Sequence, residues 1–405
     1  MWGISFVTLY VSLVWLNFLY LNHWKPKPYN KPYPTVTIVV PAHNEALNII
    51  HTLDSIVSVD YPKDKLNIIV VNDGSLDATE GLVRNFIGTH KQSKLILLNQ
   101  RQQGKAVALN NALRRVDTEL FACVDADSLI DRHSLKPMMP HFEDKSNAAV
   151  ISALKVYKPR KIIEKMQHFE YMLGILARKI RSTINTLAMT PGVLSVYRTD
   201  ILKAVGGFDK YNITEDFEIA MRLKSRAYNI QLETRSFTYT KVPTKWKDLK
   251  RQRVRWFRGY IYNHMKYRNM FFSKKDKFMG YFQLPLNIVS IFILLATLVL
   301  ISYGSVTHLF ELANRIMMIK GYLPSLFYVP PLKEIILGHD IQIMFPIYIG
   351  SLGGMYLFWI AHKELKEKIR YLTSIWAYFV VFPYLNFYYW MVSLFEESTN
   401  KTRKW

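Results

Sequence analysis

Two carboxylates one residue apart, Asp125 and Asp127, suggest chemistry more clearly than any other pair in this chain. They follow an apolar run, Leu120–Val124, that is typical of a buried strand. Because side chains at i and i+2 of a strand point to the same side, both carboxylates can converge on one cation. Hard oxygen donors suit Mg²⁺ or Mn²⁺ carrying a phosphorylated ligand. An isolated Asp-x-Asp is also a common polar turn, so the interpretation needs support from elsewhere in the chain.

Further polar clusters follow two other predicted strands. His43–Glu45 comes after the apolar run Val36–Val40, which Pro41 closes, and Asn72–Ser75 comes after Leu66–Val71. Each cluster alone is compatible with ordinary helix capping. Three such clusters at one edge of a mostly parallel sheet favour a binding site, because ligands of these sheets lie at the carboxyl ends of the strands.

Another polar cluster, Thr214–Glu218, comes directly before a segment with helical spacing of apolar residues. Capping of that helix is one interpretation. The other is that a carboxylate at the helix start stands in a cleft as a proton acceptor. Sugar transfer with inversion needs such a base, which removes the proton of the attacking hydroxyl. A metal ion and basic side chains would stabilise the charge of a leaving nucleoside diphosphate.

A basic segment, Lys245–Arg258, supplies cations further along the chain. Most of its Lys and Arg residues are suited to phospholipid headgroups. Gln252, Arg255 and Trp256 are spaced i, i+3, i+4, so they share one helix face. An Arg that reaches a diphosphate beside a Trp platform for a sugar ring is reasonable chemistry.

Alternating strands and helices must position these residues. The pattern predicts an α/β domain with a mostly parallel sheet between residues 35 and 240. Ile162–Ile180 is amphipathic, so it suits either a helix on the membrane face or one packed on the domain. The predicted strands are Val36–Val40, Leu66–Val71, Lys94–Leu98 and Leu120–Val124, and the predicted helices are Glu45–Val57, Asp77–Ile87 and Gly104–Val116.

Composition indicates a membrane protein. The chain has 405 residues, is 50% hydrophobic and carries a net charge of +22, a combination typical of membrane proteins with a basic cytoplasmic face. Nucleic acid is not an expected partner, because the chain contains no recognisable nucleic-acid-binding module. The single cysteine, Cys123, rules out an internal disulfide framework. The sequence predicts four membrane spans, Trp2–Leu21, Phe282–Tyr303, Ile341–Ala361 and Tyr371–Phe395.

These segments divide the chain into five predicted regions. They are an N-terminal transmembrane helix (1–22), a basic Pro-rich linker (23–34), the α/β domain (35–240), a basic interfacial segment (241–280) and a C-terminal membrane region with about three helices (281–405). Positive charges after the first span place the α/β domain on the cytoplasmic side of the plasma membrane.

Six motifs, taken in order, resemble the signature series of membrane-embedded family 2 glycosyltransferases, which include the cellulose, chitin, hyaluronan and poly-N-acetylglucosamine synthases. The poly-N-acetylglucosamine synthases are nearest in size. The motifs are Val40–Pro41–Ala42–His43–Asn44–Glu45, Asn72–Asp73–Gly74–Ser75, Gly104–Lys105, Asp125–Ala126–Asp127, Thr214–Glu215–Asp216 and Gln252–x–x–Arg255–Trp256.

The resemblance implies a GT-A (Rossmann-like) cytoplasmic domain flanked by transmembrane helices, and a processive, inverting transfer from a UDP-sugar to a polysaccharide or lipid-linked acceptor. Export and accessory export proteins are further expectations. By analogy, Asp216, with Glu215 beside it, supplies the general base. Asp127 and Asp125 hold Mg²⁺ or Mn²⁺, and Pro191, Gly192 and Trp256 lie near the acceptor. By the same analogy, the residues that bind the donor are Pro41, Glu45, Asp73, Lys105, Asp125, Gln252, Arg255 and Trp256.

Departures from the family pattern leave alternatives open. No Phe-x-Val-Thr gating loop follows Trp256, and the C-terminal spans are fewer than in cellulose synthases. A non-processive enzyme that adds one sugar to a lipid-linked or glycolipid acceptor explains the spans and the basic face equally well. A transporter or scaffold with an inactive nucleotide-binding domain is a third interpretation, which the intact acidic set disfavours.

Overall fold

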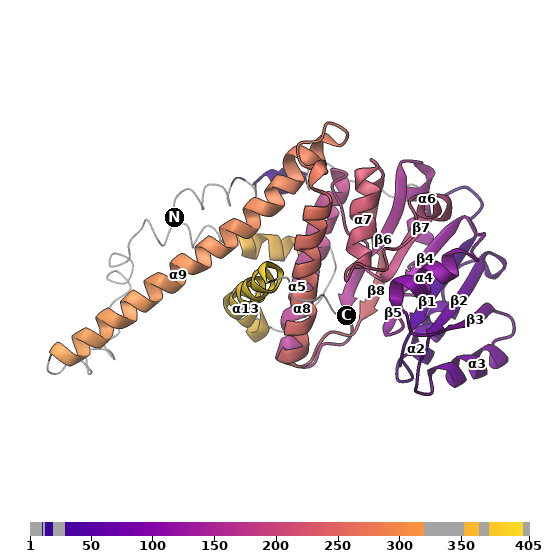
Figure 1. Ribbon diagram of the computed structural model, residues 1–405, viewed down its shortest axis with the longest axis horizontal. Helices are drawn as coiled ribbons and strands as arrows, with labels where there is room; N and C mark the ends of the chain where they lie inside the picture. Colours follow the sequence, from indigo (N-terminus) through magenta and orange to yellow (C-terminus); the bar gives the residue numbers. More distant parts are fainter. Residues whose placement is uncertain (1–9, 11–12, 19–28, 320–351, 364–371, 400–405) are drawn as a thin grey trace.

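The computed structural model describes residues 10, 13–18, 29–319, 352–363 and 372–399. Its strands form one eight-stranded sheet in the order β3-β2-β1-β4-β7-β6-β8-β5 (Figure 1). The first four strands in this order are mutually parallel, whereas β7 runs antiparallel to both of its neighbours. The strands are β1 (Val36–Ala42), β2 (Leu66–Asp73), β3 (Lys94–Gln100), β4 (Leu120–Val124), β5 (Ser128–Ile130), β6 (Asn147–Val156), β7 (Val193–Arg198) and β8 (Asn229–Thr240).

Helices cover both faces of this sheet. The α-helices are α2 (Ile49–Val57), α3 (Thr79–Thr89), α4 (Lys105–Leu113), α5 (Ile162–Thr183), α6 (Thr199–Ala204), α7 (Glu215–Ser225), α8 (Trp246–Lys266), α9 (Leu284–Met318) and α13 (Leu372–Ser398). Short 3₁₀ segments span Lys63–Lys65 (η1), Lys136–Glu143 (η2) and Arg268–Met270 (η3), and a π-helical segment spans Phe278–Gln283 (η4).

The sheet is buried on both sides because its strands are apolar at successive positions. Ile38 and Val40 of β1 pack into the core beneath α2, whereas Val39 between them packs into the core beneath α4. This alternation follows from the period of two of a strand. The predicted strand–helix alternation is confirmed, but β1 extends through Pro41, which the sequence analysis placed at its end. Pro41 is tolerated because β4 pairs with β1 only as far as Val39, so the missing N–H breaks no bond on that side.

Helix α5 packs on the domain, one of the two alternatives that its amphipathic sequence allowed. Phe169, Met172 and Ile175 on its buried face join the core beside β6 and β8. Helices α7 and α8 lie beside one another, next to α5 (Figure 1). The hydroxyl of Thr190, three residues before β7, donates to the backbone carbonyl of Asp216 and so holds the start of α7 near the beginning of β7.

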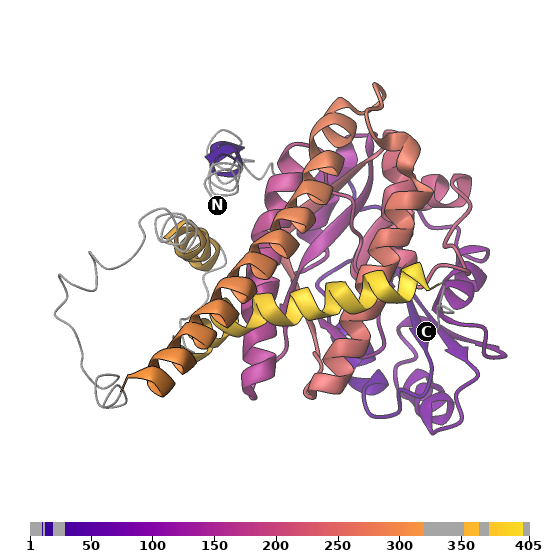
Figure 2. The ribbon, with the colours of Figure 1, turned by 60° about the vertical axis from the view of Figure 1, so that its left-hand side comes forward.

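One helix among the described residues is long and apolar enough to cross a membrane. It runs from Phe278 to Met318 and has a mean hydropathy of 2.6 in its most apolar stretch. Its side chains, such as Phe292 and Leu309, are largely exposed, and the helix projects away from the α/β domain (Figures 1 and 2). The predicted span Phe282–Tyr303 lies within this helix.

The other predicted spans have different outcomes. Most of Trp2–Leu21 and of Ile341–Ala361 lies outside the described residues. Tyr371–Phe395 is helical almost throughout, as α13, but this helix packs against α8 and α5, and although its 27 residues are long enough to cross a membrane, it is not apolar enough. Figure 2 shows α13 crossing the front of both helices. The described residues therefore support one span, not a multi-pass topology, and the division of the chain into five regions stays a prediction.

Candidate active site

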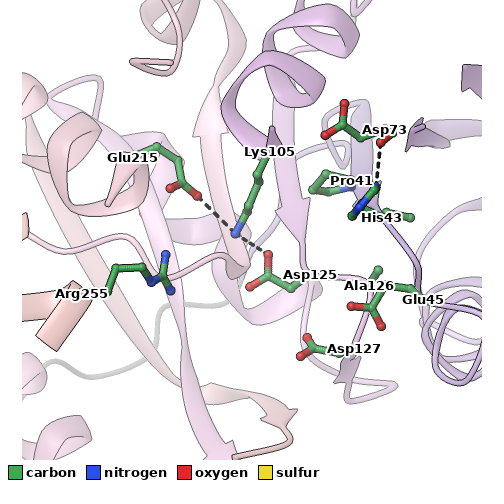
Figure 3. Close-up of a pocket in the computed structure, with 11 residues that line it drawn as sticks. Pro41, His43, Glu45, Asp73, Lys105, Asp125, Ala126, Asp127, Glu215 and Arg255 are labelled. Atoms are coloured by element: carbon green, nitrogen blue, oxygen red, sulfur yellow. Dashed lines mark hydrogen bonds and ion pairs between the residues drawn. The ribbon is translucent and has the colours of Figure 1, made fainter. Parts of the chain in front are cut away.

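A cavity of about 370 Å³ opens at the carboxyl ends of β1, β2 and β4 (Figure 3). This is the edge of the sheet at which the sequence analysis placed a site. Its walls bring together residues from all six motifs. The lining residues are Pro41, Ala42, His43, Glu45, Asp73, Lys105, Asp125, Ala126, Asp127, Glu215 and Arg255.

Lys105 joins two of these motifs. Its ammonium group forms an ion pair with Asp125 and a second, 3.3 Å long, with Oε1 of Glu215. Burial alone would lower the pKa of Lys105, but the carboxylates of Asp125, Glu215 and Asp216 outweigh it, and the pKa is well above its usual value. Lys105 therefore stays cationic and can neutralise an anionic ligand.

Gly192 lies against this ion pair. A Cβ at this position would meet Asp125 oxygens at 2.6 and 2.8 Å, and Nζ of Lys105 even closer. The backbone N–H of Asp125 also donates to the carbonyl of Gly192, at 3.1 Å. The structure thus places Gly192, which the resemblance assigned to the acceptor region, beside the Lys105–Asp125 pair.

Asp73 has a second task besides lining the cavity. Its carboxylate accepts hydrogen bonds of 2.8 Å from the backbone N–H groups of Gln103 and Gly104 and from the side chain of Gln100. These bonds fix the loop that leads into α4, and α4 begins with Lys105. Asp73 therefore positions Lys105 from a distance, whether or not it also touches a nucleotide.

Asp127 lies in a concentration of negative charge. Burial, followed by the neighbouring carboxylates of Asp125 and Glu45, raises the pKa of Asp127 to about 6. A divalent cation would relieve this repulsion, so the residues present fit the predicted metal. Within the described ranges, no group of three or more His, Cys, Asp or Glu side chains is arranged around a metal position. One or two carboxylates suffice for Mg²⁺, which takes its other ligands from phosphate and water.

The first turn of α7 separates two carboxylates. Glu215 is 3% exposed and lines the first cavity. Asp216 is partly exposed and lines a second cavity of about 420 Å³. Burial raises the pKa of Asp216, while Lys105 and Arg255 oppose the rise. Its Oδ1 accepts the N–H of Phe217 at 2.8 Å, so the free N-terminal end of α7 stabilises the anion.

The remaining predicted residues are divided between the two cavities. Arg255 lines the first and donates to the carbonyl of Ile213 at 3.1 Å. Trp256 lines the second, with the guanidinium of Arg253 4.3 Å from its ring centroid. Gln252 and Pro191 line neither cavity.

Sequence reasoning missed several residues that line the cavities. His43 was given no role, although its place between Pro41 and Glu45 was a signal, and its Nδ1 lies 2.8 Å from the carbonyl oxygen of Asp73 (Figure 3). Arg181 and Tyr260 reach the second cavity from α5 and α8. No motif surrounds these two residues, so only the packing of the helices could reveal them.

Comparison with known proteins agrees with this geometry. Residues 37–206 match the family model described as glycosyl transferase family 2. The chain therefore carries a family 2 glycosyltransferase domain, and the predicted enzyme class is confirmed at the level of this domain.

Relatives and a solved structure agree with the domain assignment. A probable glycosyltransferase, YdaM, of Bacillus subtilis is 29% identical over an alignment of 288 residues that covers 66% of this chain and 69% of that protein. A poly-beta-1,6-N-acetyl-D-glucosamine synthase of Staphylococcus epidermidis is 30% identical over an alignment of 269 residues that covers 63% of this chain and 64% of that protein. The chain thus spans about two thirds of the length of these relatives.

The structure of mannosyltransferase PcManGT from Pyrobaculum calidifontis, in complex with GDP-Man and Mn²⁺, is similar in fold. Its TM-score is 0.59 at 22% identity, over 91% of this chain and 96% of that one. The predicted α/β fold of GT-A type is therefore confirmed.

Proposed function

We propose that this protein transfers a sugar from a UDP-sugar to a growing polysaccharide, with inversion at the anomeric carbon. The observation that carries the proposal is the placement of two adjacent carboxylates. Glu215 faces the first cavity, with its cations, while Asp216 faces the second. A donor in the first cavity and an acceptor in the second would meet at the start of α7. The similarity to the Staphylococcus poly-beta-1,6-N-acetyl-D-glucosamine synthase supports a polysaccharide product.

The first cavity suits the donor. Pro41, Glu45 and Asp73 would border the nucleoside, and Lys105 and Arg255 would face the diphosphate. Fixed cations in a partly enclosed site stabilise the charge that develops on the leaving UDP. Asp127 and Asp125 would hold Mg²⁺ or Mn²⁺, which would add further positive charge at the diphosphate when bound.

Asp216 is the better candidate for the base. Glu215 is held by Lys105, whereas the Asp216 carboxylate borders the open second cavity. As the acceptor oxygen bonds to the anomeric carbon, its proton passes to Asp216 and the bond between that carbon and UDP breaks. Glu215 then acts as a positioning residue for Lys105.

The position of α9 supports a membrane setting for this reaction. Helix α9 begins at the wall of the second cavity, to which Leu286, Asn287, Ser290 and Ile291 contribute. We therefore place the reaction at the cytoplasmic face of the plasma membrane, with the phospholipid bilayer as a partner. Processive synthesis, export and accessory export proteins are extensions of the same proposal.

The second candidate function is addition of a single sugar to a lipid-linked or glycolipid acceptor. The apolar contribution of α9 to the second cavity favours it, because a lipid chain could lie along that helix. The size of the product separates the two candidates. A ladder or polymer supports the first, and a product one sugar longer than its acceptor supports the second.

The test is donor turnover by the full chain in reconstituted membranes. A panel of UDP-sugars with Mg²⁺ or Mn²⁺ should give UDP release that chelation abolishes. Asp216→Asn should lower turnover by about 10²–10⁴-fold, the usual contribution of a general base, and leave nucleotide binding intact. Asp200→Asn, an exposed carboxylate on α6, is the matched control and should be neutral. Normal turnover in Asp216→Asn would remove the base from the mechanism.

A further inference from the structure

The walls of the second cavity combine three chemistries. Thr214 and Asp216 supply polar groups from the start of α7, and Trp256 and Tyr260 supply aromatic surface from α8. The third is apolar, from Leu286 and its neighbours at the start of α9. Because sugars stack on aromatic rings and α9 is long enough to cross a membrane, the lining is suited to an amphiphile with a sugar at one end.

Arg181 adds a positive charge to this lining. It lies in the last turn of α5 and is partly buried. Its Nε is inaccessible to solvent and has no hydrogen-bond partner within the described part of the chain. Its guanidinium lies 5.6 Å from the ring centroid of Trp15, an aromatic neighbour rather than an acid.

Two other buried arginines of this region are paired with carboxylates, whereas Arg178, three residues before Arg181 on α5, donates its Nε to the backbone carbonyl of Gly174. Arg253 forms an ion pair with Glu170, and Arg258 binds Glu396 and Glu397. Among the residues that the structure describes, no carboxylate forms an ion pair with Arg181. Charged side chains that leave water are normally paired, because an unpaired charge in an apolar setting is costly.

The charge of Arg181 is permanent. Burial lowers the pKa of its guanidinium, and Tyr260 partly offsets this, but an arginine does not lose its proton in a protein. The C-terminal end of α5 stabilises the positive charge of Arg181 through the helix dipole, which does not occupy the N–H donors of the guanidinium. A planar guanidinium with free donors matches the geometry of phosphate, which it can bind through two parallel hydrogen bonds.

We propose that the second cavity binds an acceptor that carries a phosphate group, and that Arg181 is the residue that recognises this phosphate. The sugar of the acceptor lies against the aromatic wall near Asp216, and its lipid chain lies along the start of α9. This proposal rests on the proposed function, because it assumes that the acceptor presents its hydroxyl group to Asp216. It applies equally to a lipid-phosphate primer of a polymer and to a lipid-linked sugar that is extended once.

The test is equilibrium binding of geranyl phosphate to the full chain in detergent micelles. Geraniol measures the contribution of the hydrocarbon part of this ligand, and inorganic phosphate measures the contribution of the anion. Phosphatidylglycerol vesicles report on general binding of lipid headgroups. The variants are Arg181→Gln and Arg181→Lys. The matched control is Arg226→Gln, which removes an exposed charge at the C-terminal end of α7. Since no described carboxylate would be left unpaired, Arg181→Gln is expected to fold, and thermal unfolding checks this.

We expect geranyl phosphate to bind the unmodified chain at least tenfold more tightly than geraniol or inorganic phosphate. Arg181→Gln should abolish that preference, Arg181→Lys should retain part of it because the charge remains, and Arg226→Gln should match the unmodified chain. Unchanged binding in a folded Arg181→Gln variant would overturn the proposal. Displacement of geranyl phosphate by phosphatidylglycerol at equal lipid concentration would also overturn it, because the site would then be a general headgroup contact.

UDP release in the same preparations separates this proposal from the proposed function. If no nucleotide sugar is turned over but geranyl phosphate binding depends on Arg181, the phosphate site stands and the transferase proposal falls. If donors are turned over and geranyl phosphate binding does not depend on Arg181, only the phosphate-site proposal is refuted.

Discussion

The close approach of Gly192 to the Lys105–Asp125 pair gives the sharpest test of the donor site. In Gly192→Ala, the new Cβ would lie 2.6 and 2.8 Å from the Asp125 oxygens. Ordinary contacts are about 3.5 Å, so the carboxylate would have to retreat by roughly 0.7–0.9 Å, or Lys105 would have to leave it. The backbone of Gly192 is not in the left-handed region, so alanine brings no backbone strain of its own.

The expected effect falls on catalysis rather than on folding. Displacing a positioning group by about 1 Å can cost about 100-fold in rate. We therefore expect UDP release to fall by about 10²-fold and the KM for the donor to rise. Unfolding temperature should change little, because the atoms that move are the ends of side chains. The control is Gly88→Ala in α3, where nothing lies within 4 Å of the new Cβ, and it should leave turnover unchanged.

A double-mutant cycle identifies the route of the effect. If Gly192→Ala acts through Lys105, its loss and the loss in Lys105→Ala should be far from additive. Wild-type rate and donor KM in Gly192→Ala would refute the reasoning. Additive losses would show that Gly192 acts by another route.

Two predictions concern the stability of the α8 region. Burial lowers the pKa of His264 to about 4, below its value of about 6.5 in the unfolded chain. As the pH falls below 6.5, the unfolded chain therefore takes up the proton first. The free energy of unfolding should fall by about 2–3 kcal/mol as the pH drops towards 4. His264→Phe should flatten this dependence in pH-resolved thermal unfolding, and an unchanged slope would contradict the assignment. Arg258 lies 3.0 Å from Glu396 and 2.7 Å from Glu397 on α13, so Arg258→Met should cost on the order of 3 kcal/mol by removing both ion pairs. Adding Glu396→Gln and Glu397→Gln should restore much of that loss in denaturant titration, whereas no restoration would show that Arg258 acts through other contacts.

Sequence patterns alone predicted the strands of the first half of the sheet, β1 to β4. Strand β1 and its neighbours read as continuous apolar runs because the sheet is buried on both faces. Boundaries were less certain, since they depend on local competition for hydrogen bonds. The helix was predicted to begin at Asp77, but α3 begins at Thr79, and the Asp77 carboxylate accepts the N–H groups of Thr79 and Ala46.

Candidate site residues could be found where the chemistry is local. Asp125 and Asp127 follow a strand directly, and Lys105 begins a helix, so their types and positions were informative by themselves. The residues of the second cavity were not accessible in this way. Arg181 directly follows the amphipathic segment Ile162–Ile180, and only the approach of α5 to α8 and α9 shows that it lines a cavity.

What the sequence determined by itself is the identity of the strands, the acidic groups at their ends and the long apolar helix, because each depends on neighbours within a few residues. Tertiary structure alone decided that Glu215 and Asp216, adjacent in the chain, face different cavities. The physical reason is that successive residues of a helix point about 100° apart. The packing of α7 between the sheet and α8 then fixes which direction leads to the first cavity and which to the second.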